Sequence, residues 1–254
     1  MYYCVKELTM PEKEWFINWF DSEYYHLLYN NRNEAEAESF IEQLVSYLNV
    51  PLKSKVLDVA CGKGRHSKTL ARLDFDVTGI DLSANSILAA KKFETDTLHF
   101  DVWDMRKTYR ESCFDVAMNL FSSFGYLPTD EDNLIALKAI ASNLKPDGKL
   151  VLDYLNAEAI IKEMKPREII QRGEIQFHIQ KKIENGFIKK TIEFVDENGT
   201  AHEYTEQLRI IKPETFAALF QSSGLRIDIV FGSYGLDDFS SGKSLRQIII
   251  ATKI

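Results

Sequence analysis

VLDVACGKGRHS, from Val56 to Ser67, is the most informative stretch of this 254-residue chain. An apolar run typical of a buried strand ends at two glycines, Gly62 and Gly64, and a helical pattern follows. Glycines at such a point let the backbone turn sharply and approach a ligand, and the N-terminus of the next helix faces the same ligand. Ser67 stands where the dinucleotide fingerprint has its third glycine, so the loop alone does not identify the ligand.

The next two predicted strands end in acidic residues. FDVTGID closes at Asp81, where a carboxylate can accept hydrogen bonds from both hydroxyls of a ribose. TLHFDV closes at Asp101 and Val102, which can accept from an adenine amino group and donate a backbone N–H to the ring. Open α/β sheets bind ligands outside the carboxyl ends of their strands, so these strand ends together predict one nucleoside site.

Apolar strands alternate with amphipathic helices along most of the chain. This alternation predicts an α/β protein with a doubly wound, mostly parallel sheet covered by helices on both faces. The seven strands are expected at residues 55–60, 75–81, 97–102, 113–121, 148–155, 225–232 and 244–253.

Two segments depart from the alternation. Residues 11–48 carry aromatic and apolar side chains at helical spacing and predict two helices, the first reaching Tyr29 and the second capped by Asn33. Residues 167–211 predict antiparallel strands joined by tight turns at ENG and DENG. The expected organisation is a helical lid at 1–50, an α/β domain at 51–164 and 212–254, and a β insertion at 165–211, after the fifth strand.

The order of these motifs resembles the class I S-adenosylmethionine-dependent methyltransferases. The similarity lies in DVACGKG, GIDLS, FDV, FDVAMNL and LKPDGKLVLD; it covers about residues 54–155 and, in outline, 225–252. It implies a Rossmann-like sheet whose last strand, SLRQIIIATK, is antiparallel. It also implies S-adenosylmethionine as cofactor and S-adenosylhomocysteine as product.

The resemblance implies a place for each part of the cofactor. The methionine part would lie along the first glycine loop, the ribose on Asp81, and the adenine beside Leu82, Asp101 and Val102. Asn119, at the end of the fourth strand, would lie near the methionine or the transferred methyl group. The expected cofactor-binding residues are Asp58, Ala60, Gly62, Gly64, Asp81, Leu82, Asp101, Val102 and Asn119.

The methyl acceptor is narrowed by exclusion. A net charge of −7 disfavours nucleic acid, and NLFSS follows the fourth strand where DNA amino-methyltransferases have two prolines. A small-molecule acceptor is expected, with nitrogen, oxygen, sulfur and carbon all open as the methylated atom. Because the sulfonium is already activated, in-line positioning in a water-poor pocket is the main requirement, and a general base is optional unless the acceptor is a protonated amine or an unactivated hydroxyl. The candidate acceptor-pocket residues are Tyr24, Tyr25, Tyr126, Tyr154 and Tyr234.

Other features of the sequence bear on metal binding, on the cellular compartment and on partners. Cys4, Cys61 and Cys113, together with the five histidines, lack metal-ligand spacing, so no metal site is expected. The odd cysteine count and the lack of a signal-peptide or membrane-spanning pattern favour a cytoplasmic protein with no membrane partner. Arg246 is expected in a surface ion pair. The oligomeric state is open.

Two other functions compete with methyl transfer. The first is an NAD-dependent oxidoreductase, because Asp81 suits the ribose of any adenosine. The second is a non-catalytic S-adenosylmethionine-binding module, because intact cofactor motifs do not require turnover.

Overall fold

The computed structural model describes residues 15–29 and 34–254. Two features singled out in the sequence, Cys4 and the expected helix cap Asn33, lie outside these residues, as does the start of the expected lid. The helices in the described part of the chain include none that is long and apolar enough to cross a bilayer.

A seven-stranded sheet forms the centre of the molecule, in the order β10-β11-β5-β4-β1-β2-β3. Its strands are β1 (Lys55–Val59), β2 (Asp76–Asp81), β3 (Leu98–Val102), β4 (Phe114–Asn119), β5 (Leu144–Leu155), β10 (Leu225–Phe231) and β11 (Arg246–Lys253). Strands β1 to β5 pair in parallel, and β11 is antiparallel to both of its neighbours. The predicted mostly parallel sheet with an antiparallel last strand is therefore confirmed. β5 starts earlier than predicted because Leu144 already pairs with Phe114, ahead of a register shift.

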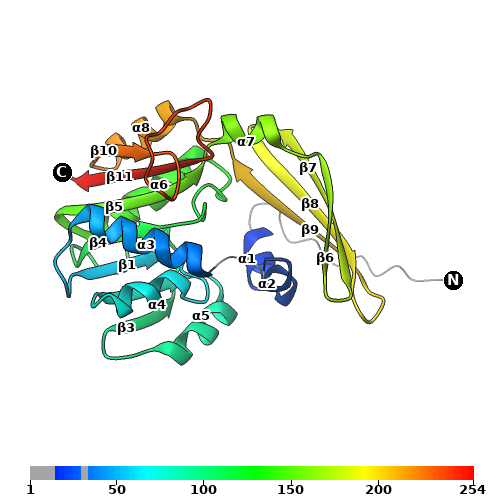
Figure 1. Ribbon diagram of the computed structural model, residues 1–254, viewed down its shortest axis with the longest axis horizontal. Coiled ribbons are helices and arrows are strands. Elements are labelled where there is room, and N and C mark those ends of the chain that lie inside the picture. The colour runs from blue at the N-terminus through cyan, green and yellow to red at the C-terminus, as the bar shows by residue number, and fades with distance from the viewer. Residues whose placement is uncertain (1–14, 30–33) are drawn as a thin grey trace.

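Helices cover both faces of this sheet (Figure 1). On one face, α3 (Glu34–Leu48), α4 (Arg65–Arg72) and α5 (Ala84–Ala90) share a core with alternate side chains of the strands, and a 3-10 turn (Lys91–Phe93) follows α5. On the other face lie α6 (Asp130–Asn143) and α8 (Pro213–Ser222). A short helix that the sequence pattern did not predict, α7 (Ala157–Glu163), follows β5.

The N-terminal segment corrects one prediction. The helix expected to reach Tyr29 is broken into α1 (Trp15–Phe20) and α2 (Glu23–Leu28). The break has a local cause, since the Ser22 hydroxyl accepts a hydrogen bond from the backbone N–H of Tyr25 at 3.1 Å and so caps a new helix.

The predicted β insertion is a separate antiparallel sheet, in the order β6-β7-β8-β9. Its strands are β6 (Arg167–Arg172), β7 (Ile175–Glu184), β8 (Phe187–Val195) and β9 (Ala201–Arg209), and β6 is one strand more than the pattern predicted. Side chains on one face, including Phe177 and Phe194, form a third core with Trp19 and Leu28 of the first two helices. Helices α1 and α2 consequently lie between the two sheets (Figure 1).

Candidate active site

A cavity of about 570 Å³ lies at the carboxyl ends of the central strands. The loop after β1, the end of β2, residues 103–106 after β3 and the loop after β4 line it from the sheet side. Helices α1 and α2 line the opposite side with Phe16, Phe20 and Tyr25, among others. This size and position are those of a ligand pocket in an α/β protein.

The loop after β1 is shaped by two glycines with different roles. A methyl group on Gly64, which has φ of 76°, would lie 2.5 Å from the ring of Phe100, so the helix start packs closely against β3. Gly62 has φ of 57° and open space where a side chain would be, which leaves room for a ligand against the backbone. Ala60 also has a positive φ, of 59°, and lines the cavity with Gly62.

Asp81 joins the glycine loop to the end of β2. Its Oδ2 accepts the backbone N–H of Gly62 at 2.8 Å, and its Oδ1 accepts the backbone N–H of Ser83 at 2.8 Å. Burial raises the pKa of Asp81, while these two hydrogen bonds act in the opposite direction. Asp81 and Leu82 both line the cavity, so this carboxylate is held rigidly beside the glycine backbone.

Asp58 lies on β1 directly below the loop. Its carboxyl group is 1% exposed and accepts a hydrogen bond from the Ser67 hydroxyl at 2.5 Å. Burial raises the pKa of Asp58 to about 7, although the bond from Ser67 opposes the shift. A cavity-lining acid near its titration point at neutral pH is sensitive to any charge that a ligand brings.

The buried Asp58 predicts a pH dependence of stability. Since its ordinary pKa is 3.8, the folded chain holds a proton between about pH 4 and about pH 7 that the unfolded chain has lost. The free energy of unfolding contributed by this group should therefore fall as pH rises through that range and level off above it. Urea unfolding at several pH values should show a shallower decline for Asp58→Asn than for the wild type. Parallel pH profiles for the two proteins would contradict this assignment.

The end of β3 is adjacent to this site but oriented differently. Val102 lies opposite Asp81 in the parallel register, as the sequence implied. The Asp101 carboxylate, however, accepts a hydrogen bond from the Tyr109 hydroxyl, and neither Asp101 nor Val102 lines the cavity. Residues 103–106, just beyond the strand, line it instead.

Asn119 supports the site from below. It is fully buried at the end of β4, and its side-chain Nδ2 donates to the Val59 carbonyl at 3.0 Å. This bond ties β4 to β1 immediately beneath the cavity, whose lining includes the next residue, Leu120.

Two of the five candidate tyrosines line the cavity. Tyr25 and Tyr126 both face Phe20, with ring centroids 4.9 Å from its ring in each case. Trp15 packs behind them, 5.6 Å from both Phe20 and Tyr126. Phe20, Tyr25 and Tyr126 thus form an aromatic wall on one side of the cavity.

The other three tyrosines are engaged outside the cavity. The Tyr24 hydroxyl donates to Asp196 at 3.1 Å, in the turn between β8 and β9. Tyr154 is fully buried and donates to a backbone carbonyl of β9. The Tyr234 hydroxyl donates to Asp153 at 3.2 Å.

Sequence reasoning missed several residues that line the cavity. Trp19 of α1 packs in the core shared with the insertion. Phe16 and Phe20 of the same helix also line the cavity, and aromatic residues on both faces of one helix were the available signal. The further missed residues include Tyr29, Arg65, Trp103 and Phe121.

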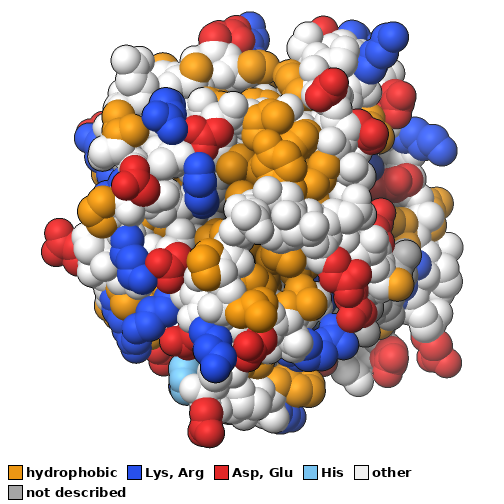
Figure 2. All heavy atoms as spheres, turned by 60° about the vertical axis from the view of Figure 1, so that its left-hand side comes forward, with side chains coloured by type: hydrophobic (Ala, Val, Ile, Leu, Met, Phe, Trp, Pro, Cys, Tyr) orange, Lys and Arg blue, Asp and Glu red, His pale blue; other side chains and the backbone are white. Residues whose placement is uncertain are grey.

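Charged side chains of both signs lie together on one face of the molecule. Over the face shown in Figure 2, Lys and Arg side chains are interspersed with Asp and Glu side chains, and hydrophobic side chains gather near the centre. On this face of the described residues no continuous basic patch is visible.

Comparison with known proteins identifies the part of the chain that builds this site. Residues 56–148 match the family of methyltransferase domains. These residues are a methyltransferase domain. The match agrees with the resemblance of the motifs to the class I, S-adenosylmethionine-dependent methyltransferases, and this domain contains the glycine loop, Asp58 and Asp81.

Curated relatives with methyltransferase names match about half of this chain. A dTDP-3-amino-3,4,6-trideoxy-alpha-D-glucopyranose N,N-dimethyltransferase of Streptomyces venezuelae is 34% identical over 136 residues, 52% of this chain and 56% of its own length. A glycine/sarcosine N-methyltransferase of Aphanothece halophytica is 33% identical over 138 residues, 52% of this chain and 50% of its own length. The chain thus spans about half the length of the curated relatives it matches.

Similarity of structure covers nearly the whole chain. An S-adenosylmethionine-dependent methyltransferase from Clostridium acetobutylicum has a TM-score of 0.75 at 19% identity, covering 90% of this chain and 95% of that one. This similarity establishes the fold around the methyltransferase domain.

Proposed function

We propose that the protein is an S-adenosylmethionine-dependent methyltransferase that methylates an amine on a small molecule. The observation that carries the proposal is the convergence of Asp58, Gly62 and Asp81 on one cavity within a methyltransferase domain. Neither the oxidoreductase nor the non-catalytic alternative has comparable support.

The residues of the cavity fit the cofactor. Asp81 would accept hydrogen bonds from the ribose hydroxyls, Leu82 would lie against the adenine, and the open backbone at Gly62 would lie along the methionine part. When bound, S-adenosylmethionine supplies a methyl group already activated on a sulfonium. Asp101 and Val102 would reach the adenine if Asp101 exchanged its bond with Tyr109 for one to the adenine amino group.

A nitrogen acceptor is supported by the relatives and by the lid. Two relatives are, by name, N-methyltransferases of an amino sugar and of glycine and sarcosine. In this chain the wall formed by Phe20, Tyr25 and Tyr126 suits the positive charge that develops on the nitrogen as a neutral amine takes the methyl group from the sulfonium, because aromatic faces attract positive charge. Under this proposal the lid at 1–50 and the insertion at 165–211 border the acceptor and exclude water from it.

The proposal includes the cytoplasm as the working compartment. Cys61 and Cys113 are both free thiols, which a reducing environment maintains. A small-molecule acceptor, with no role for nucleic acid or membrane, agrees with the interspersed surface charges.

Ligand-induced stabilisation tests the cofactor. At 100 times its dissociation constant, S-adenosylmethionine or S-adenosylhomocysteine should stabilise the fold by about 2.7 kcal/mol and raise the melting temperature measurably. NAD and NADP should leave the melting temperature unchanged. A shift with NAD and none with either adenosyl compound would favour the oxidoreductase instead.

Turnover separates an enzyme from a binding module. Formation of S-adenosylhomocysteine should be measured with a panel of small amines, including amino sugars and glycine, and with matched alcohols and thiols. Product formation with the amines alone supports the proposal, whereas faster turnover of an alcohol or thiol would contradict the nitrogen acceptor.

A further inference from the structure

The loop after β4 holds an unusual backbone conformation beside the cavity. Phe121 and Ser122 are consecutive non-glycine residues that both have φ of 60°. Side chains disfavour this left-handed region, so two such residues in a row persist only where the surroundings fix them. Leu120, Phe121 and Ser123 line the cavity, so whatever fixes this loop also shapes the site.

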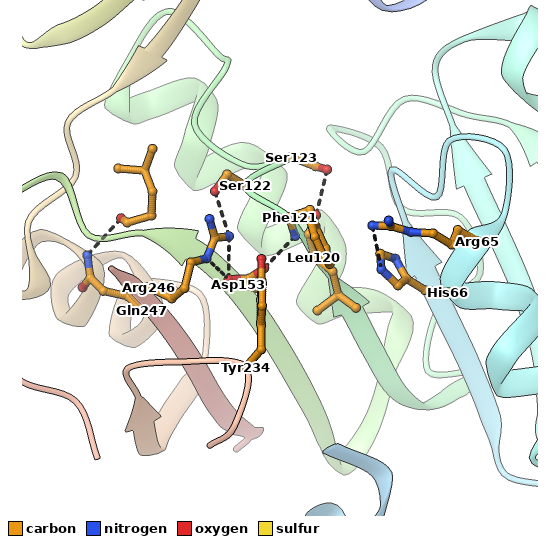
Figure 3. A network of polar contacts seen from close by, with 11 residues as sticks. Arg65, His66, Leu120, Phe121, Ser122, Ser123, Asp153, Tyr234, Arg246 and Gln247 are labelled. Atoms are coloured by element: carbon orange, nitrogen blue, oxygen red, sulfur yellow. Dashed lines mark hydrogen bonds and ion pairs between the residues drawn. The ribbon is translucent and has the colours of Figure 1, made fainter. Parts of the chain in front are cut away.

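A buried ion pair outside the cavity fixes the loop (Figure 3). Asp153 lies on β5 and is 0% exposed. Its carboxylate accepts a hydrogen bond from the backbone N–H of Phe121 at 2.8 Å, and its backbone carbonyl accepts one from the backbone N–H of Ser122 at 3.0 Å. Arg246, on β11, donates to the same carboxylate through Nε at 2.8 Å and to the Ser122 hydroxyl at 3.0 Å. The expectation of a surface ion pair for Arg246 is therefore wrong, because its partner lies inside the protein.

Phe121 carries this constraint to the glycine-loop side of the cavity. Its ring stacks on the imidazole of His66, with centroids 4.9 Å apart and an interplanar angle of 25°. The guanidinium of Arg65 lies 4.5 Å from the centroid of the Phe121 ring. Arg65 and His66 both line the cavity, so the ring and the two side chains form one packed unit (Figure 3).

This unit and Asp81 lie on opposite sides of the β1 loop. The strand order β4-β1-β2 places the loop that bears Phe121 on one side and Asp81 on the other. A nucleoside held at Asp81 would therefore extend its sulfur substituent towards Arg65, whose planar guanidinium suits an amino-acid carboxylate.

We propose that Asp153 and Arg246 are positioning residues for the amino-acid end of the cofactor. Their ion pair holds the 120–123 loop, and Phe121 in turn sets the orientation of Arg65 and His66. The inference rests on the proposed function, since it assumes that the cavity binds an adenosylmethionine. A positioning role of this kind affects the binding of the amino-acid end of the ligand only. General stabilisation of the fold would affect the binding of the whole ligand.

Two ligands that differ at that end test the proposal. S-adenosylhomocysteine carries the amino-acid group, and 5′-methylthioadenosine keeps the adenosine and the sulfur but lacks it. By calorimetry, Asp153→Asn should weaken the binding of S-adenosylhomocysteine about tenfold and that of methylthioadenosine less than about twofold.

A control carboxylate lies on β10. Asp228 pairs with Lys149 at 2.9 Å, on the same sheet but away from the cavity. Asp228→Asn should leave the affinities for both ligands unchanged. Without ligand, hydrogen exchange of the amides at 120–123 should speed up in Asp153→Asn and not in Asp228→Asn.

Further variants keep the proposal testable if Asp153→Asn does not fold. Asp153→Asn combined with Arg246→Met avoids leaving a lone buried charge and should show the same ligand-selective loss. Phe121→Leu removes the ring that transmits the constraint, and combining it with Asp153→Asn should add little further loss. Equal weakening of both ligands, or no weakening, overturns the positioning role. A wild type that binds neither ligand overturns the proposed function itself.

Discussion

Replacing Asp81 by alanine should weaken the binding of S-adenosylhomocysteine about 100-fold. The substitution removes the acceptor proposed for both ribose hydroxyls, and a hydrogen bond to a charged group contributes about 1.5–3 kcal/mol. The backbone N–H groups of Gly62 and Ser83 lose their acceptor as well, so the glycine loop is held less firmly. Titration calorimetry at constant pH and salt measures the change directly.

The opposite end of the same strand supplies the control. Asp76 is the first residue of β2 and Asp81 the last, and both are partly buried. Asp76→Ala should leave the affinity for the ligand unchanged, and Asp81→Asn should fall between the wild type and Asp81→Ala because an amide oxygen can still accept one bond. Unchanged affinity in Asp81→Ala would show that the ribose binds elsewhere.

The parts of the fold that the sequence predicted have strong local periodicity. The VLDVA run covers most of β1 and GID ends β2, and the inner positions of both strands are buried, as expected for a parallel sheet covered on both faces. The missed strand β6 has alternating exposed and half-buried residues without such a run. The break at Ser22 was missed because helical spacing continues on both sides of it, and a capping hydroxyl only matters once the chain has turned.

The site residues likewise divide into those that a local sequence pattern predicts and those whose position depends on contacts distant in sequence. Asp58, Gly62 and Asp81 were predicted because a strand end fixes the place of its last side chains. Tyr154 stands at a strand end too, but its direction depends on a partner 55 residues away along the chain. Phe121 could not have been predicted, since its position depends on a buried carboxylate contributed by another strand.

Long-range contacts of this kind also hold the lid in place. The Asp21 carboxylate, between α1 and α2, accepts the Ser83 hydroxyl at 2.6 Å and the backbone N–H of Asn85 at 3.0 Å. Ser83 also donates its backbone N–H to Asp81, so the lid contacts the same corner that is proposed to bind the ribose. On its other side the lid is fixed to the insertion through Glu206 of β9. The segment of α1 and α2, which lines one side of the cavity, is thus held to the start of α5 and to β9.

Glu206→Ala should lower the free energy of unfolding by about 3 kcal/mol, because it leaves a buried charge without its partner. Glu206 accepts the indole N–H of Trp19 at 2.7 Å and the hydroxyl of Tyr29 at 2.8 Å. Lys190 of β8 lies 3.6 Å from the carboxylate, and both charged side chains are only 14% exposed. Burial lowers the pKa of Lys190, which indicates how poorly this environment would tolerate the ammonium alone. Urea denaturation followed by circular dichroism measures the loss.

An exposed carboxylate on the same strand, β9, serves as the control for Glu206. Glu203 lies on β9 opposite Glu193 and is exposed, so Glu203→Ala should change the free energy of unfolding by less than about 0.5 kcal/mol. Removing both buried charges, with Glu206→Met and Lys190→Met together, should restore most of the stability lost in Glu206→Ala, since an apolar pair of similar volume needs no partner. If the double variant is instead less stable than Glu206→Ala, the hydrogen bonds to the carboxylate, and not its charge, hold the lid to the insertion.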